Sequence, residues 1–567
     1  MLQQLIKILF LILVCLATLI NRPILGLNSY IVILTGLFAF IGLICKKQSE
    51  IRIRTIDILF LIVILYSQFN QKRVNLDLTI QYLSMVAVWF YIKTLDSSKF
   101  NKFILHAVIL AATIHSIVAC LQSFGMLSNN NYYYSTTGLF NNPGHLGCIL
   151  SFAFSAFLPY VIINYKILTR KHKIIALFIW GLLLTGIVLA DSRAAYLAII
   201  VSTTTFYFIK QHNKIQKSVI HIGFAVVLMS CIVLLMYMYR PSSANARLNI
   251  WKICIHSIKE APIFGHGTGD FRKTYMLKQA DFLSNACEEI RRNADEVKTA
   301  FNLPLELLYE QGIIGLLLWC SIIGISIKNK LNDNNDPNAQ LLLFPIISFL
   351  IFSLFSYPHL IWGLLCPFII LISIGGGKDV FLVLHGKILN KVFLCTEITI
   401  FTILLLLSIL TVSIDRKLTK YSTFELDSKD FESKNLTNIL LYYYPSLLSI
   451  YVENQIATKD YNAAIPTITQ LKQYRNSFQI ERDLAYSYEL VGDTIKALEH
   501  YDIAHKMCPG YLEPLLSKFL IYESKNDSLA ITLAKEIIDF THKITNSRTD
   551  AMKSRVALFL DTGTIGL

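Results

Sequence analysis

Thirteen apolar segments of roughly membrane-spanning length lie within the first 415 residues, and they constrain the fold more than any other feature. They fall near 5–20, 28–45, 57–69, 78–94, 102–127, 144–165, 174–190, 194–209, 218–238, 313–327, 340–356, 360–376 and 392–413. The composition agrees, because 54% of the residues are hydrophobic and 16% are charged, whereas soluble domains carry about 25% charged residues. The sequence therefore predicts an all-α polytopic membrane helical bundle of about 12–13 spans and excludes a soluble enzyme or a disordered chain.

The loops between these segments concentrate positive charge on one side. If the N-terminus is cytoplasmic, nineteen Lys and Arg residues lie in cytoplasmic loops and four lie in the short loops opposite. The four are Arg22, Lys72, Arg73 and Arg193. The positive-inside rule therefore predicts a cytoplasmic N-terminus, and it places a large loop, 239–312, on the outer face. No small-residue cleavage site follows the first segment, so we expect an uncleaved span rather than a signal peptide.

Residues 416–567 differ from the apolar part of the chain. They contain 18 basic and 19 acidic residues, so the net charge of +14 arises in residues 1–415. Similar stretches begin at three aspartates that are 33 and 34 residues apart, Asp460, Asp493 and Asp527. The central copy resembles a tetratricopeptide repeat. We expect a C-terminal soluble α-helical repeat domain that binds a protein partner, and a generic helical hairpin domain is the alternative.

The outer-face loops contain five short motifs. They are Gly-Leu-Phe-Asn-Asn-Pro at 138–143, Ser-Arg-Ala at 192–194, Arg-x-x-x-Trp at 247–251, Pro-x-x-Gly-x-Gly-x-Gly-x-Phe at 262–271 and Asn-x-x-x-Glu-x-x-x-Glu-x-Gly at 302–312. An arginine at the membrane surface is costly when it faces lipid. Arg193 is therefore expected either to pair with Asp191 or to face a cavity and bind an anion such as a phosphate.

In this order and topology, the motifs resemble the O-antigen ligase family, which includes O-antigen polymerase-like proteins and bacterial O-linked oligosaccharyltransferases. The resemblance covers roughly residues 100–375. It implies a bacterial inner-membrane enzyme with a periplasmic loop and a periplasmic C-terminal domain. The implied reaction transfers a glycan from undecaprenyl diphosphate to an acceptor hydroxyl at the periplasmic face.

The resemblance also implies roles for two arginines. Arg193 matches the family's arginine after Ser, and Arg247 matches its loop arginine. Both are assigned to the diphosphate, where fixed cations stabilise the charge that develops as the sugar–phosphate bond breaks. No Asp-x-Asp motif occurs on an outer loop, so we expect neither a metal nor another cofactor.

One position departs from the family pattern. Phe301 stands where the family usually has the histidine that is its presumed general base, and a phenyl ring cannot accept a proton. We predict His266, in the adjacent glycine-rich turn, as the base. The alternatives are His145 and His359 at helix ends, Glu306 and Glu310.

The remaining predicted site residues are expected to bind substrate. They are Asn142, His145, Asn302, Glu310 and Tyr357. Glu310 is also a candidate for bracing the helix that follows it.

The acceptor is left open by the sequence. A lipid A–core acceptor gives lipopolysaccharide, a protein hydroxyl gives an O-linked glycoprotein, and a growing chain gives O-antigen polymerase activity. A transporter of the lipid-linked glycan is the non-enzymatic alternative. It is disfavoured because the spans show no internal repeat and few acidic residues or histidines.

Overall fold

A computed structural model of the chain describes most of the sequence. The described residues are 2–19, 27–45, 50–95, 98–129, 131, 133–211, 237–332, 337–374, 380–385, 387–421, 441–541 and 547–562. The apolar segment expected at 218–238 falls almost entirely outside them, and Arg22 also lies outside them.

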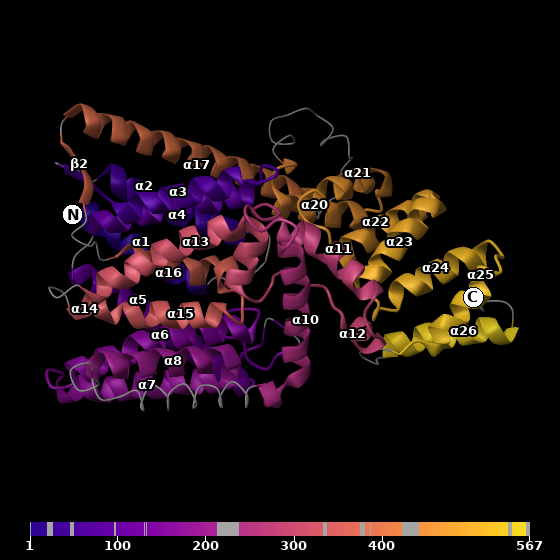
Figure 1. Cartoon of the computed structure of the whole chain (residues 1–567), viewed down its shortest axis with the longest axis horizontal. Coiled ribbons are helices and arrows are strands. Elements are labelled where there is room, and N and C mark those ends of the chain that lie inside the picture. Colours follow the sequence, from indigo (N-terminus) through magenta and orange to yellow (C-terminus); the bar gives the residue numbers. More distant parts are fainter. Residues whose placement is uncertain are drawn as a thin grey trace.

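The other twelve apolar segments all form helices, which lie side by side in one bundle (Figure 1). The bundle consists of α1 (Leu2–Leu19), α2 (Leu27–Ile44), α3 (Thr55–Phe69), α4 (Leu76–Leu95), α5 (Ser98–Ser123), α6 (Pro143–Asn164), α7 (Arg170–Ala190), α8 (Arg193–Gln211), α13 (Leu303–Leu331), α14 (Pro337–Leu341), α15 (Leu343–Ser353), η2 (Pro358–Leu360), α16 (Trp362–Ser373) and α17 (Lys387–Tyr421). Among the described residues, six helices are long and apolar enough to cross a membrane, namely α4, α5, α6, α7, α13 and α17. The all-α polytopic fold is therefore confirmed, while the number of spans stays a prediction.

One short sheet accompanies the helices. Strand β1 (Glu50–Arg54) pairs antiparallel with β2 (Val380–His385), and Arg52 lies opposite Val383. The sequence analysis did not anticipate this pairing, which joins segments far apart in the chain at the bundle end where the N-terminus lies (Figure 1).

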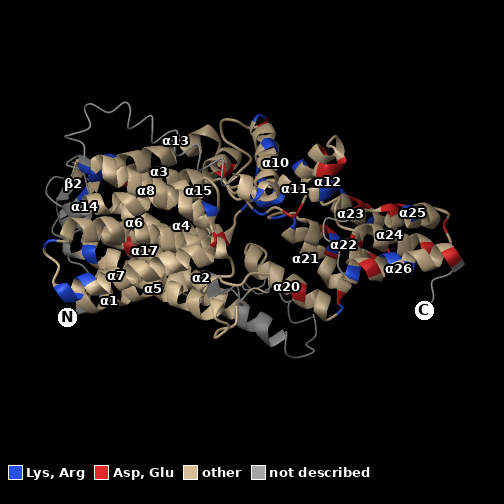
Figure 2. Ribbon diagram, turned by 90° about the horizontal axis from the view of Figure 1, so that it is seen from below, with Lys and Arg blue, Asp and Glu red and all other residues tan. Residues whose placement is uncertain are grey.

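Charged residues separate along the long axis of the molecule. Figure 2 shows Lys and Arg near the N-terminal end of the bundle, few charges along its middle, and both signs of charge in the C-terminal helices. This distribution agrees with the positive-inside prediction, although the orientation in a membrane stays a prediction.

Three helices of the loop 239–312 lie between the bundle and the C-terminal helices. They are α10 (Pro241–Ile258), α11 (Phe271–Ser284) and α12 (Glu288–Asn293). Helix α10 runs crosswise to the bundle helices, at their ends (Figure 1). The apolar core of this region joins Tyr275 of α11 and Tyr309 of α13 to Met507 of the C-terminal part.

The C-terminal part, called the tail below, is a series of helices that each pack against the next. They are α20 (Pro445–Ala457), α21 (Tyr461–Leu471), α22 (Phe478–Val491), α23 (Thr494–Met507), α24 (Glu513–Ser524), α25 (Leu529–Asp539) and α26 (Ser547–Thr562). Asp460 and Asp493 are the N-caps of α21 and α23, and Asp527 lies just before the N-cap of α25. The three carboxylates accept a backbone N–H from Ala463, Lys496 and Leu529. The residue before each has a positive φ, 62° at Lys459, 96° at Gly492 and 52° at Asn526. The spacing of 33 and 34 residues thus corresponds to a repeated turn, while the tetratricopeptide-like class stays a prediction.

The tail shares its apolar core with the bundle. Leu447 and Leu448 of α20 belong to the same cluster of buried residues as the bundle helices. The carboxylate of Asp77, at the start of α4, accepts hydrogen bonds from the N–H of Ser446 at 2.9 Å and from its hydroxyl at 2.7 Å. The predicted division into residues 1–415 and 416–567 is therefore bridged by a continuous core, and it stays a prediction.

The tail contains a buried carboxylate, that of Glu481, whose substitution offers a test of the tail's packing. Glu481 of α22 forms ion pairs with Lys472 at 2.7 Å and, when the imidazole is protonated, with His500 at 2.8 Å. Burial alone would raise the pKa of Glu481, but the interactions with His500 and Lys472 outweigh it and lower the pKa. The resulting stabilisation is complete above the unfolded-state pKa of a glutamate and is lost as the pH falls through the lower folded-state pKa.

We therefore expect Glu481→Gln to lower the free energy of unfolding of the tail by about 2 kcal/mol at neutral pH. The difference from the parent protein should shrink at acidic pH, where both side chains are neutral. Hydrogen exchange of α22 and α23 in the full-length protein measures the effect. Glu499→Gln, at an exposed position on α23, is the control and should change little.

Candidate functional site

Arg193 lies at the tail-facing end of the bundle, where α7 ends and α8 begins. Asp191 ends α7 in the left-handed conformation, with φ 42°. The Arg193 guanidinium donates to the Arg240 carbonyl at 3.2 Å and to the Ser243 hydroxyl at 3.1 Å. Asp191 forms its ion pair with Arg240 at 2.6 Å. The α7–α8 turn and the start of α10 are thereby held together.

Arg247 lies further along α10 than Arg240 and belongs to the same end of the bundle. Its guanidinium carbon lies 5.4 Å from the centre of the Phe301 ring, a cation–π distance. Burial lowers the pKa of Arg247, and the positive charge of Arg193 lowers it further. The two predicted arginines are thus close enough to repel each other, and an anion bound between them would relieve that repulsion.

Three aromatic or imidazole rings continue from Arg247 toward the bundle. Phe301 contacts Tyr357 edge-to-face with ring centres 5.2 Å apart, and Tyr357 contacts His145 in the same way at 5.1 Å. The Tyr357 hydroxyl also accepts a hydrogen bond from Asn142 at 3.2 Å. Four of the sequence-predicted positions, Arg247, Tyr357, His145 and Asn142, are therefore connected to Phe301 through direct contacts.

Phe301 itself adopts a conformation that is unusual for a phenylalanine. Its φ is 52°, in the left-handed region, which costs about 1–2 kcal/mol for a residue with a Cβ atom. Such strain persists where the surroundings hold a residue in place. Here Arg247 lies over the ring and Tyr357 packs against it.

The loop that carries Asn142 is shaped by two residues of α5 that the sequence analysis missed. The side chain of Gln122 accepts hydrogen bonds from the N–H groups of Thr137 and Gly138 and donates to the Gly138 carbonyl at 2.8 Å. His115 accepts from the N–H of Leu139. A polar residue in an apolar helix was the available signal for both, because such residues in spans usually have a specific partner.

Both predicted asparagines act as helix caps. The carboxamide oxygen of Asn142 accepts from the Gly144 N–H at 2.7 Å at the start of α6, and that of Asn302 accepts from Leu305 at 3.0 Å at the start of α13. Asn302 also donates to the Leu354 carbonyl at 3.2 Å. These bonds explain the local fold, and a direct role for either asparagine in binding stays a prediction.

Glu306 and His359 form a buried pair one helical turn beyond Asn302. The Nε2 atom of His359 lies 3.2 Å from Oε1 of Glu306. The other carboxylate oxygen accepts from the N–H of Ala300 at 3.0 Å and from the hydroxyl of Thr299. These contacts fix the carboxylate on both sides.

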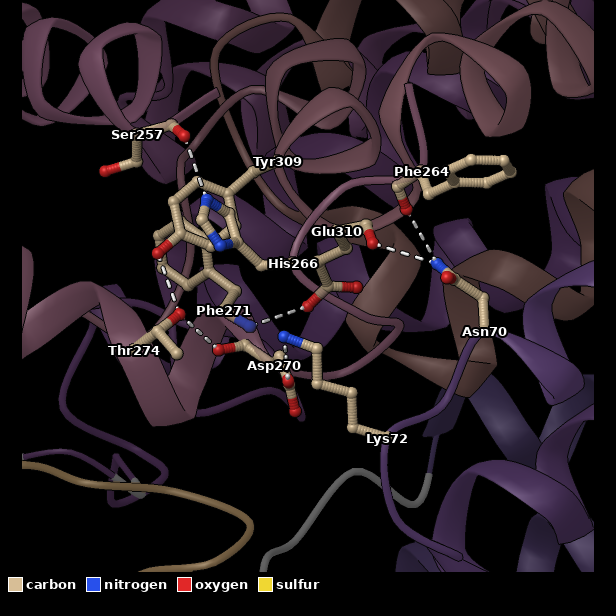
Figure 3. Close-up of polar contacts among 10 residues, drawn as sticks. All are labelled: Asn70, Lys72, Ser257, Phe264, His266, Asp270, Phe271, Thr274, Tyr309 and Glu310. Atoms are coloured by element: carbon tan, nitrogen blue, oxygen red, sulfur yellow. Dashed lines mark hydrogen bonds and ion pairs between the residues drawn. The ribbon is translucent and has the colours of Figure 1, made fainter. Parts of the chain in front are cut away.

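The glycine-rich turn 265–269 packs on α13 and brings His266 and Glu310 together (Figure 3). The Glu310 carboxylate accepts a hydrogen bond from the Phe271 N–H at 3.1 Å. The backbone carbonyl of Glu310 accepts one from the Gly267 N–H at 2.9 Å. Glu310 therefore braces the glycine-rich turn, and its expected role in bracing the helix that follows it stays a prediction.

His266 is oriented by its own contacts in this turn. Its Nε2 atom donates to the Ser257 carbonyl at 2.9 Å, and its ring centre lies 4.7 Å from that of Tyr309. Figure 3 shows His266 near Tyr309 and Ser257. Among the described residues, the hydrogen bonds and ring contacts of His266 connect it to this turn rather than to Arg193 or Arg247.

The end of α3, which the sequence analysis also missed, completes the support of this turn. Asn70 donates to the carbonyls of Phe264 and Glu310 at 3.1 and 3.0 Å, and Lys72 forms an ion pair with Asp270 at 3.8 Å. The ion pair gives Lys72, one of the cations predicted on the outer face, a structural partner.

No cluster of three or more His, Cys, Asp or Glu side chains suited to hold a metal ion occurs in the part of the chain that the structure describes. The expectation of a metal-independent site stays a prediction.

The site and the fold together define a multi-pass α-helical membrane protein with an arginine-rich site at one end of its bundle. A family model described as O-antigen ligase matches residues 177–320, from α7 to the middle of α13. The chain therefore carries a domain of the O-antigen ligase family, and the resemblance found in the motifs is confirmed. A search of curated proteins finds no match.

The kink in α13 offers a direct test of the turn packing. Gly312 has φ 64° and ψ −167° inside the helix, and a Cβ atom there would collide with the carbonyl of Ile263 and lie 2.7 Å from the nitrogen of Gly265. We expect Gly312→Ala to destabilise the protein by about 3 kcal/mol or more, because both the backbone angle and the contact are incompatible with a side chain.

Gly324 of the same helix is the matched control. A Cβ atom at this position meets no atom within 4 Å, so Gly324→Ala should be neutral or slightly stabilising. Thermal unfolding of the two purified variants measures the difference. Equal melting temperatures would show that the turn does not depend on the close backbone contact.

Proposed function

We propose that the protein transfers a glycan from undecaprenyl diphosphate to an acceptor hydroxyl at the periplasmic face of the inner membrane. The O-antigen ligase domain supports a glycosyltransferase of the ligase or polymerase type. The single observation that supports this donor is the proximity of two guanidinium groups: burial lowers the pKa of Arg247, the positive charge of Arg193 lowers it further, and two neighbouring cations suit a ligand with two phosphates.

The leaving group explains why the site uses arginines. When the bond between the sugar and the diphosphate breaks, negative charge develops on the phosphate oxygen that departs. Cations that are already in place stabilise this charge without a reorganisation step. Arg193 is held by the Arg240 carbonyl and Ser243, and Arg247 is held over Phe301, so both groups meet this requirement.

From the sequence alone, His266 is the predicted base that activates the acceptor, and His359 is among its alternatives. The Nε2 atom of His266 is engaged with the Ser257 carbonyl, so Nδ1 is the atom that would accept a proton. His266→Gln tests the prediction, because glutamine keeps a donor for the Ser257 carbonyl and cannot act as a base.

The arginine assignment predicts a large loss of activity. We expect Arg193→Gln and Arg247→Gln each to reduce transfer about 10²–10³-fold, the loss typical of removing one group that stabilises developing charge. Lys252→Gln, which removes an exposed cation from the same helix as Arg247, should leave transfer unchanged. Glycan transfer is measured at equal protein abundance in membranes. Parental transfer in both arginine variants would refute the diphosphate assignment.

The acceptor is a separate question. We propose a lipid A–core or protein hydroxyl, with a growing glycan chain as the polymerase alternative. Deleting the gene and comparing lipopolysaccharide ladders with glycoprotein stains distinguishes them, because only the product of the true acceptor should disappear. Removing the tail would be a poor test, since α20 shares its apolar core with the bundle.

A further inference from the structure

A second recess lies apart from the arginine site. It is a cavity of about 470 Å³ enclosed by the bundle, the glycine-rich turn, α11 and the first part of the tail. Its polar lining includes Asp77, Arg272, Glu306, Glu310, His359 and Arg475, and its apolar lining includes Trp319, Phe349 and Trp362. Neither Arg193 nor Arg247 lines it. Its volume lies within the range of about 300–1,000 Å³ typical of small-molecule sites.

The Glu306–His359 pair lies in the wall of this cavity. A carboxylate oxygen only accepts hydrogen bonds, so Nε2 of His359 carries the proton that it donates to Glu306. The neutral ring then has its lone pair on Nδ1. This atom is buried and has no hydrogen-bond partner among the described residues. An unpaired buried nitrogen costs free energy that a ligand hydroxyl would recover.

Two short segments connect this pair to the arginine site. Thr299 and Ala300 bond to Glu306, while the next residue, Phe301, packs against Arg247. In the second segment, Tyr357 packs on Phe301, and His359 follows two residues later. The Glu306–His359 pair of the cavity wall is therefore linked to the donor site through these two segments.

Other histidines at this end of the bundle lack such a partner. The hydrogen bond of His266 goes to a backbone carbonyl, and both ring nitrogens of His145 are buried without a partner among the described residues. A base needs an orienting group that fixes its tautomer and stabilises its protonated form. At this end of the bundle, His359 has a carboxylate in that position, on a wall that faces a cavity.

We propose that the cavity binds the acceptor, a hydroxyl-bearing amphiphile such as a sugar on an apolar anchor, and that His359, positioned by Glu306, is the general base. This inference rests on the proposed function. The hydroxyl proton passes to Nδ1 of His359, and the hydroxyl oxygen bonds to the anomeric carbon of the donor. The bond from that carbon to the phosphate oxygen breaks, and its electron pair leaves on the diphosphate beside Arg193 and Arg247. The proton on His359 then returns to solvent.

Substitution of the pair tests the base. The assay uses purified full-length protein, an undecaprenyl-diphosphate-linked glycan, and membranes of the deletion strain as the source of acceptor. We expect His359→Gln to lower kcat about 10²–10⁴-fold, the usual contribution of a general base, with little change in KM for the donor. His256→Gln, at an exposed position on α10, is the control.

The pH profile separates catalysis from a structural role. The parent enzyme should lose activity at low pH as the imidazole becomes protonated. The His359→Gln variant should have a low rate that does not fall further at low pH, so its profile lacks the acidic limb. Glu306→Gln removes the orienting charge and should lower kcat at least 10-fold while keeping a pH-dependent limb. The other titratable or charged groups around the cavity, Asp77, Tyr82, Arg272, Glu310, Tyr474 and Arg475, are present in both variants. A shared limb in the parent and His359→Gln would therefore overturn the assignment.

Filling the cavity tests the acceptor site independently. Leu307 lines the cavity and its neighbour Leu308 does not, although both lie on α13 and are partly exposed. We expect Leu307→Trp to raise KM for the acceptor at least 10-fold without changing KM for the donor, and Leu308→Trp to have little effect. Equal kinetics in the two tryptophan variants would show that the acceptor binds elsewhere.

The outcomes also separate this inference from the proposed function. If Arg247→Gln abolishes transfer while His359→Gln retains the parental rate and pH profile, the inference fails and the proposed function stands. If His266→Gln, rather than His359→Gln, removes the acidic limb of the pH profile, the base lies in the glycine-rich turn. If none of these variants affects transfer, both proposals fail.

Discussion

The close backbone contact between α13 and the glycine-rich turn is the constraint on which the rest of the site depends. At Gly312 the helix departs from helical angles, and its backbone lies so near Ile263 and Gly265 that no side chain fits. The N–H of Ile313 bonds to the Pro262 carbonyl at 2.9 Å across this contact. Because the turn is fixed in this way, the first part of α13 presents Asn302, Glu306 and Glu310 to three different neighbours. A straight α13 would still contain Asn302, Glu306 and Glu310, but it would lack the packed glycine-rich turn to which Glu310 bonds.

Much of the architecture was predictable because it follows from local physical chemistry. The cost of exposing a backbone in lipid forces long apolar segments to become helices, and every expected segment within the described residues did so. Arg193 was identifiable because a cation predicted at the outer surface needs a reason to be there, and Arg247 because it matches the loop arginine of the O-antigen ligase family. The repeated aspartates were visible in the sequence, and each lies at or just before the start of a tail helix, after a residue with positive φ.

What escaped prediction depends on contacts between distant residues. Glu306 and His359 are 53 positions apart, and only the fold shows that they form one pair in a cavity wall. Gln122 looked like an ordinary polar residue in an apolar helix until its bonds to the loop were seen. The asparagines of two motifs were expected to bind substrate, yet their bonds to backbone show what they do for the fold. Motif residues identify a region well, but the atoms that each one meets are set by packing.

The hydrogen bonds between the start of α4 and the tail determine how late in synthesis the bundle can be completed. Asp77 and Ser446 are 369 positions apart, and Leu76 donates its N–H to the Tyr443 carbonyl. At a synthesis rate of about 5–20 residues per second, the early helices wait roughly 20–70 s before these partners exist. During that interval a carboxylate and part of an apolar core have none of their final contacts. The nascent bundle therefore remains open on its tail-facing side until nearly the whole chain has been made, so an early stop would leave an incomplete membrane domain as well as a missing tail.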